Sequence, residues 1–157
     1  MPDPGHHQPC TDYLQTLLLY YEEEISGEAY FYGLAEHFSE REKTILLARI
    51  EGHAAAAVEP LLEKYGLKPR DDTTLECEGR SHVERHQSFS WLQFMTYVVE
   101  RYPLYTEDFL ALERMAPAAD QSALKKLTAH EVAVINFARK ELAGDTNSVD
   151  LLLQYLD

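Results

Sequence analysis

The stretch Leu14–Phe38, LQTLLLYYEEEISGEAYFYGLAEHF, most constrains what this chain can fold into, because it has the length and periodicity of one long helix. At 100° per residue, Glu24 and Glu28 fall in the middle of its apolar side, one turn apart. A buried, unpaired carboxylate is costly and two adjacent ones repel each other, so the pair requires a proton, a positive partner or a metal ion. The same side carries Leu14, Leu17, Tyr21, Ile25, Tyr32 and Ala35.

Three further stretches have helical periodicity, which predicts an all-α chain. The first helix is expected to begin at a cap on Thr11 or Asp12 and to end near residue 38. The others are expected at about 40–65, 89–116 and 119–143. Gly66 and Gly144 are suited to end the second and fourth helices, because glycine accepts the left-handed conformation common after a helix.

Local signals predict details of these helices. Ser39 and Glu42 have the spacing of a capping box at the start of the second helix. Pro60 removes a backbone donor and should kink or interrupt the last turns of that helix. Pro103 should bend the third helix near its middle.

The segments before, between and after the expected helices divide the chain into three predicted regions. Residues 1–10, rich in proline, form a flexible N-terminal arm, and residues 11–144 form a four-helix bundle. The polar segment 67–88 shows no helical stripe, and its length suits a crossover that travels the length of a bundle. Residues 145–157, with Ser148 as a cap, form a short C-terminal helix that docks on its own bundle or on a second subunit, and we expect a homodimer.

Charge and composition limit the partners. The chain has 157 residues, a formal net charge of −13 and no run of lysine or arginine, so neither nucleic acid nor an anionic membrane is an expected partner. The start lacks the features of a signal peptide, no apolar run reaches membrane-spanning length, and two cysteines form no disulfide framework. These features predict a cytoplasmic protein.

Other polar residues also interrupt the apolar stripes. Glu131 lies near the centre of the fourth helix's stripe with His130 at its flank, and Glu51 lies on a shoulder of the second helix. Glu28 precedes the first turn by about as many residues as Glu51 follows it, so antiparallel helices place both at one height. Glu107 and His130 are likewise about equally far from the turn between the third and fourth helices, so they are expected at one height. Glu107, however, points away from the apolar stripe of the third helix, whereas Tyr105 points inward at that level.

These glutamates resemble the ferritin-like superfamily, whose dinuclear members bind iron or manganese in a bundle of four helices. The resemblance covers roughly residues 12–143. The family pattern has a Glu on two helices and Glu-x-x-His on the other two. Glu28, Glu51 and Glu131 match glutamates of that pattern, whereas positions 54 and 134, where the family has histidine, are Ala54 and Val134.

The resemblance implies an iron- or manganese-dependent oxidoreductase that uses dioxygen or peroxide. Glu28, Glu51 and Glu131 would supply oxygen ligands and His130 a nitrogen ligand, a donor set that suits iron or manganese. Glu24 would be a further ligand or a partner of one. Tyr105 would donate a hydrogen bond or an electron. The substrate is a small molecule that the sequence does not identify.

Two alternatives remain open at this stage. In the first, the chain is a non-catalytic bundle that acts through protein–protein contacts, with its inward glutamates in a protonated or hydrogen-bonded network. A rival zinc site would use the crossover and the arm. Its candidate ligands are Cys77, His82, His86, His6, His7 and Cys10. His53, on the opposite shoulder from Glu51, is expected to bind no metal.

Overall fold

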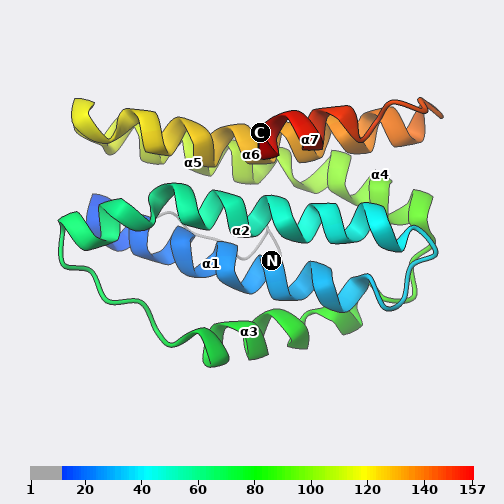
Figure 1. The fold of residues 1–157 in the computed structure, drawn as a ribbon, viewed down its shortest axis with the longest axis horizontal. Coiled ribbons are helices and arrows are strands. Elements are labelled where there is room, and N and C mark those ends of the chain that lie inside the picture. Colours follow the sequence, from blue (N-terminus) through cyan, green and yellow to red (C-terminus); the bar gives the residue numbers. More distant parts are fainter. Residues whose placement is uncertain (1–11) are drawn as a thin grey trace.

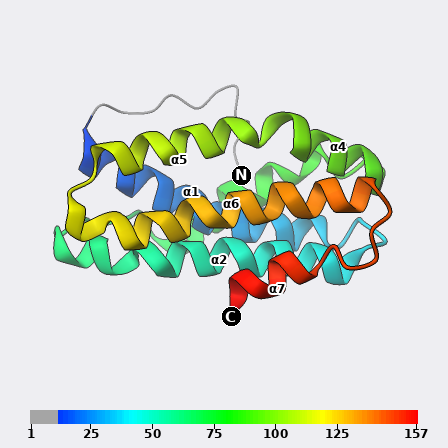
Figure 2. The ribbon, with the colours of Figure 1, turned by 90° about the horizontal axis from the view of Figure 1, so that it is seen from above.

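The computed structural model describes residues 12–157, and within that range the chain forms helices and connections without any strand. Thr11 and the predicted arm 1–10 lie outside the described residues. Helices α1 (Tyr13–Leu34), α2 (Arg41–Lys64) and α6 (Gln121–Leu142) run along the long axis of the molecule (Figure 1). Helices α4 (Trp91–Arg101) and α5 (Pro103–Met115) follow each other end to end beside α6 (Figure 2).

The ends of α1 and α2 follow local signals in part. Asp12 caps α1, and its side chain accepts a hydrogen bond from the backbone N–H of Gln15 at 3.0 Å. The predicted capping box at Ser39 is wrong, because Glu40 precedes α2 and Ser39 donates instead to the Glu40 carboxylate. Of the kink or interruption predicted at Pro60, the interruption is wrong, because α2 continues through Pro60 to Lys64 and ends before Gly66, whose φ is 65°. The kink stays a prediction.

The predicted third helix is divided into two. Ser90 and Gln93 form a capping box at the start of α4, which ends at Tyr102. Pro103 occupies the first turn of α5, where its missing N–H costs nothing. The helix is thus divided one residue before Pro103, although the backbone of Tyr102 is itself helical (φ −69°, ψ −23°), and the predicted bend stays a prediction. Two short 3-10 turns, η2 (Val83–Arg85) and η3 (Ala118–Asp120), precede α4 and α6.

The crossover contains a helix that the sequence pattern did not predict. Helix α3 (Asp72–Ser81) is capped by Asp71 and packs along α1, on the side away from α6 (Figure 1). Its only buried residues are Leu75 and Gly79, so its apolar stripe is too short for a periodicity signal. Ser26 of α1 donates to the backbone carbonyl of Leu75 at 2.8 Å.

Helix α1 is therefore covered on two sides, which changes its buried face. Tyr20, Tyr30 and Phe31 are buried, whereas Tyr32, which was predicted on the inward side, is 45% exposed. The prediction of one apolar side failed for Tyr32 because it assumed a helix that packs on one surface only.

Substituting Gly79→Ala is expected to destabilise the fold by roughly 2 to 3 kcal/mol. A Cβ atom at this position would lie 2.0 Å from the Ser26 backbone carbonyl oxygen, so α3 would have to move away from α1. Urea denaturation measures the effect. Thr73→Ala, at an exposed position of the same helix, is the control, and equal stability of the two variants would contradict the close approach.

The C-terminal segment docks on its own chain. Helix α7 (Asp150–Leu156) contacts α6 and α2, and the Leu152 side chain is fully buried there. Val149, not the predicted Ser148, precedes the helix, and the Ser148 hydroxyl binds the Glu141 carboxylate. None of the helices in the described range has the length and apolar character needed to cross a membrane.

Candidate metal centre

Three buried side chains from three helices converge at the middle of the molecule. Glu24 of α1, Glu51 of α2 and His130 of α6 each contribute one ligand-type atom, and these atoms all lie within 4.8 Å of one another. His130 Nε2 is 3.0 Å from Glu24 Oε2 and 3.0 Å from Glu51 Oε2. The side chains are at most 1% exposed, so solvent does not screen their charges.

The ring of His130 is oriented by its other nitrogen. Nδ1 is paired with the backbone carbonyl of Leu127, an acceptor, so Nδ1 carries a hydrogen. In a neutral ring, Nε2 then presents a lone pair to two carboxylates. This arrangement is repulsive unless a proton or a cation lies between the groups, and a carbonyl that fixes the far nitrogen is typical of metal-binding histidine.

The spacing of these atoms suits a bound cation. Two adjacent ligands of an octahedral ion, each about 2.1 Å from the metal, are about 3.0 Å apart. Both separations from His130 Nε2 have this value. Glu24 Oε2, Glu51 Oε2 and His130 Nε2 also lack a hydrogen-bond partner of normal geometry among the described residues, so the donor set fits a metal ion.

Glu131 adds a third carboxylate to this centre. Its Oε2 lies 3.5 Å from His130 Nε2, and its side chain is fully buried. Neither of its oxygens has a hydrogen-bond partner within the described part of the chain. Glu131 is therefore available as a fourth ligand or as a proton carrier beside the other three.

Another buried acid shows how this chain satisfies a carboxylate without a metal. Asp120 is also fully buried, but its oxygens accept hydrogen bonds from Lys64, Tyr65 and Tyr13 at 2.5 to 2.7 Å. These partners lower the pKa of Asp120 against the effect of burial. No lysine or arginine in the described range forms an ion pair with Glu24, Glu51 or Glu131.

The electrostatics of the centre reflect this lack of fixed positive charge. Burial and the charge of Glu51 raise the pKa of Glu24 well above its usual range. Burial raises the pKa of Glu131 to about 8. Burial opposes ionisation of Glu51 as well, but its contacts with Glu24 and His130 outweigh that effect and lower its pKa. Although burial alone would lower the pKa of His130, the carboxylate of Glu24 raises it.

Glu28 lies apart from the group of three. Its side chain is half-buried, and its carboxylate passes over Gly52 of α2, where a Cβ atom would be 1.8 Å from Glu28 Oε2. Burial and the charge of Glu51 raise the pKa of Glu28. The structure thus brings together Glu24, Glu51, His130 and Glu131, and it places Glu28 at the margin, beside a groove that also contains Glu76 and Arg80.

Substituting Gly52→Ala is expected to displace the Glu28 carboxylate while changing metal affinity less than about threefold and stability by less than about 1 kcal/mol. The clash falls on the far end of a flexible side chain, and alanine favours a helix interior. Metal titration and thermal unfolding measure the two quantities. Loss of metal binding would place Glu28 among the ligands, and Glu63→Ala, at an exposed position of the same helix, is the control.

Aromatic rings enclose the centre. The Phe109 ring is 5.4 Å from the His130 ring, and the Tyr155 ring of α7 is 6.4 Å from it. Tyr105 is 1% exposed, and burial, with the charges of nearby glutamates including Glu131, raises its pKa. Tyr105 is buried, as the sequence pattern predicted, and its role at the centre stays a prediction. The sequence pattern missed Tyr155, because only the docking of α7 brings this residue close to His130.

The other residues considered as metal ligands lie outside the group of three. His53 is exposed, with its ring 5.3 Å from that of Tyr155, and Glu107 is exposed on α5. The rival zinc site is not assembled within the described residues: Cys77 is exposed on α3, whereas His86 is buried and its Nδ1 is bonded to the Tyr30 hydroxyl at 2.6 Å. Its other proposed ligands, in the arm, lie outside the described range.

Comparison with known proteins does not assign this chain to a family. No family model matches the sequence, and neither the curated proteins nor the solved structures contain a significant match. The resemblance to the ferritin-like superfamily therefore stays a prediction from residue pattern.

Proposed function

We propose that this protein is a ferritin-like four-helix bundle that binds iron or manganese and acts as an oxidoreductase toward dioxygen or peroxide. The observation that carries the proposal is the convergence of Glu24, Glu51 and His130, fully buried and without hydrogen-bond partners of normal geometry among the described residues. In the bundle, α4 and α5 together take the place of the third helix, and the segment containing α3 is the crossover.

The donor set favours these two metals. Carboxylate oxygens suit manganese, imidazole nitrogen suits iron, and a mixed set of two carboxylates and one imidazole accommodates either. The set also leaves coordination positions open on a six-coordinate ion, and the metal would supply one-electron redox chemistry with dioxygen or peroxide there. Zinc would use the same donors without redox chemistry, so the identity of the bound metal distinguishes the two.

The residues around the metal have separate roles in binding it, orienting its ligands, excluding water and handling protons. Glu24 and Glu51 balance the charge of a divalent ion, and the Leu127 carbonyl keeps the His130 ring oriented. Phe109 covers the ring of His130 and excludes water. Glu131 holds or releases a proton beside the ligands, and the hydroxyl of Tyr105 donates a hydrogen bond or an electron.

Metal content tests the proposal. The protein is purified without an affinity tag or chelator and analysed by mass spectrometry, before and after anaerobic loading with Fe²⁺ or Mn²⁺ and removal of excess metal. About one ion per chain from the group of three is expected, or two if Glu28 and Glu131 complete a second position. Absence of bound metal after loading would refute the proposal.

The alternative is a non-catalytic bundle whose inward acids are held by protons. The raised pKa values of Glu24 and Glu131 favour it, because protonation would relieve their repulsion. Against it, α7, its expected docking element, already packs on α6 and α2 of the same chain. Dimer formation and a cytoplasmic location remain predictions.

A further inference from the structure

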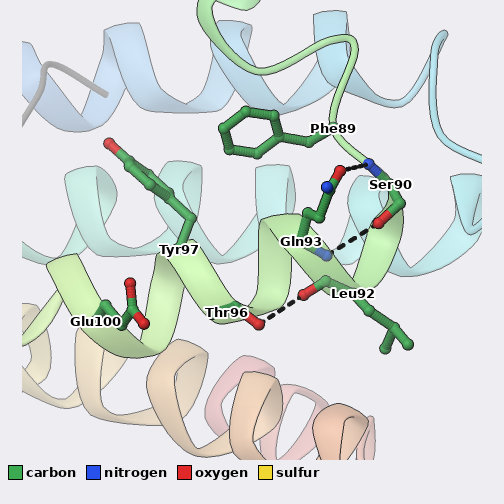
Figure 3. A pocket seen from close by; sticks show the side chains of 7 residues that line it. All are labelled: Phe89, Ser90, Leu92, Gln93, Thr96, Tyr97 and Glu100. Atoms are coloured by element: carbon green, nitrogen blue, oxygen red, sulfur yellow. Dashed lines mark hydrogen bonds between the residues drawn. The ribbon is translucent and has the colours of Figure 1, made fainter.

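A groove of about 450 Å³ lies on α4 and shares no residue with the metal centre. Seven side chains between Phe89 and Glu100 line it, and it is called the α4 groove below. Figure 3 shows the rings of Phe89 and Tyr97 on its wall, and their centroids are 6.2 Å apart. The volume is in the range of small-molecule sites, so the groove is large enough for a ligand.

The aromatic wall of the α4 groove is held in place from behind. The Tyr97 ring packs against the rings of His86 and Phe94, at 4.4 Å and 6.2 Å between centroids. The Phe89 ring also packs against His86, at 5.2 Å. His86 is buried, and its Nδ1 is bonded to the Tyr30 hydroxyl at 2.6 Å. A ligand would therefore meet a preformed wall and lose little affinity to ordering it.

Most polar groups of the α4 groove already have partners within the helix. Ser90 and Gln93 bond each other's backbone N–H groups in the capping box, and the Thr96 hydroxyl donates to the Leu92 carbonyl at 2.9 Å (Figure 3). The Glu100 carboxylate differs, because it forms no ion pair with any described residue. Glu100 is thus the charged group of the groove that remains available to a ligand.

The charge and the rings of the α4 groove favour a cation. Glu100 lies one helical turn after Tyr97, so its carboxylate and the tyrosine ring are neighbours on one face of α4 (Figure 3). The face of an aromatic ring attracts an ammonium group, and a carboxylate accepts its N–H groups in charge-assisted hydrogen bonds. An anion would be repelled by Glu100 and by the net charge of −13.

We propose that the α4 groove binds a small organic cation of the arylalkylammonium class. The aryl group of the ligand packs against Phe89 and Tyr97, and its ammonium group pairs with Glu100. Leu92, which is 56% exposed, extends the apolar surface that the ligand covers. The inference goes beyond the proposed metal-dependent function and does not depend on it, because the groove and the centre have no residue in common.

Nuclear magnetic resonance titration of the metal-free, full-length protein tests the proposal with three probes that share a phenyl ring. Phenethylammonium is expected to bind with a Kd of about 1 mM or below and to shift the amide signals of residues 89–100. The neutral 2-phenylethanol is expected to bind about threefold more weakly, and the anion phenylacetate not detectably. Equal affinity for the three probes, or shifts confined to other helices, would overturn the proposal.

Variants at exposed positions assign the charge contact without disturbing the core. Glu100→Gln is expected to lower the affinity for phenethylammonium about threefold, to abolish its dependence on salt and to leave 2-phenylethanol binding unchanged. Thr96→Arg places a guanidinium group one turn from Glu100 and is expected to prevent phenethylammonium binding. Glu107→Gln, at an exposed acid of α5, is the control. Parent-like, salt-dependent phenethylammonium binding in Glu100→Gln would overturn the proposal.

Discussion

Replacing Glu51 with glutamine is expected to weaken Fe²⁺ or Mn²⁺ binding at least about 100-fold, because even residues behind the ligands change metal affinity 10- to 100-fold. Glu51 Oε2 is one of the three atoms that converge, and an amide oxygen is a weaker, uncharged donor. The metal-free variant is expected to be less stable than the parent protein at neutral pH, because contacts with Glu24 and His130 lower the pKa of Glu51 and so stabilise its charged form in the folded state.

Isothermal titration with Mn²⁺ and urea denaturation of the metal-free protein measure these two effects. Glu107→Gln is the matched control, because Glu107 is exposed on α5 and lies outside the group of three. A structural carboxylate network without a metal has no Mn²⁺ affinity to lose, so the Mn²⁺ titration distinguishes the two hypotheses. Parent-like Mn²⁺ affinity in Glu51→Gln would remove Glu51 from the ligand set.

The stability of the metal-free protein is expected to fall by about 2 to 5 kcal/mol between pH 5 and pH 8. Burial raises the pKa of Glu131 from 4.5 to about 8, so the folded state keeps a proton that the unfolded state releases in this interval. The stabilisation is complete below the unfolded pKa and is lost as the pH rises through the folded one. Glu24 and His130, whose pKa values are also raised, act in the same direction.

Glu51, whose pKa is lowered, acts in the opposite direction, but its contribution is lost only below the usual range of a glutamate. Metal binding should reverse the pH trend, because ligands bind a cation in their deprotonated forms and affinity then rises with pH. Urea denaturation from pH 5 to pH 8, with and without Mn²⁺, measures both trends. Glu131→Gln is expected to flatten the metal-free trend, and a flat profile in the parent protein would contradict the raised pKa values.

Local residues account for much of the helical architecture. Asp12 begins α1, Gly66 follows α2, and Pro103 begins α5, each for a reason contained within a few residues of chain. Helix α3 was missed because its stability comes from a short contact with α1, through Leu75 and Gly79, and not from a periodic stripe.

The sequence by itself also identified the buried acids of the candidate site. Glu24, Glu51 and Glu131 interrupt apolar stripes, and burying an acid there is so costly that it marks a site. The sequence pattern placed Glu24 and Glu28 together on the inward side of the first helix. Only the tertiary structure separates them: Glu24 lies beside Glu51 and His130, whereas the carboxylate of Glu28 passes over Gly52. A stripe fixes which side of a helix is apolar only to within tens of degrees. Which carboxylates meet depends on how α1, α2 and α6 are rotated and shifted against one another, and packing of the whole core sets those quantities.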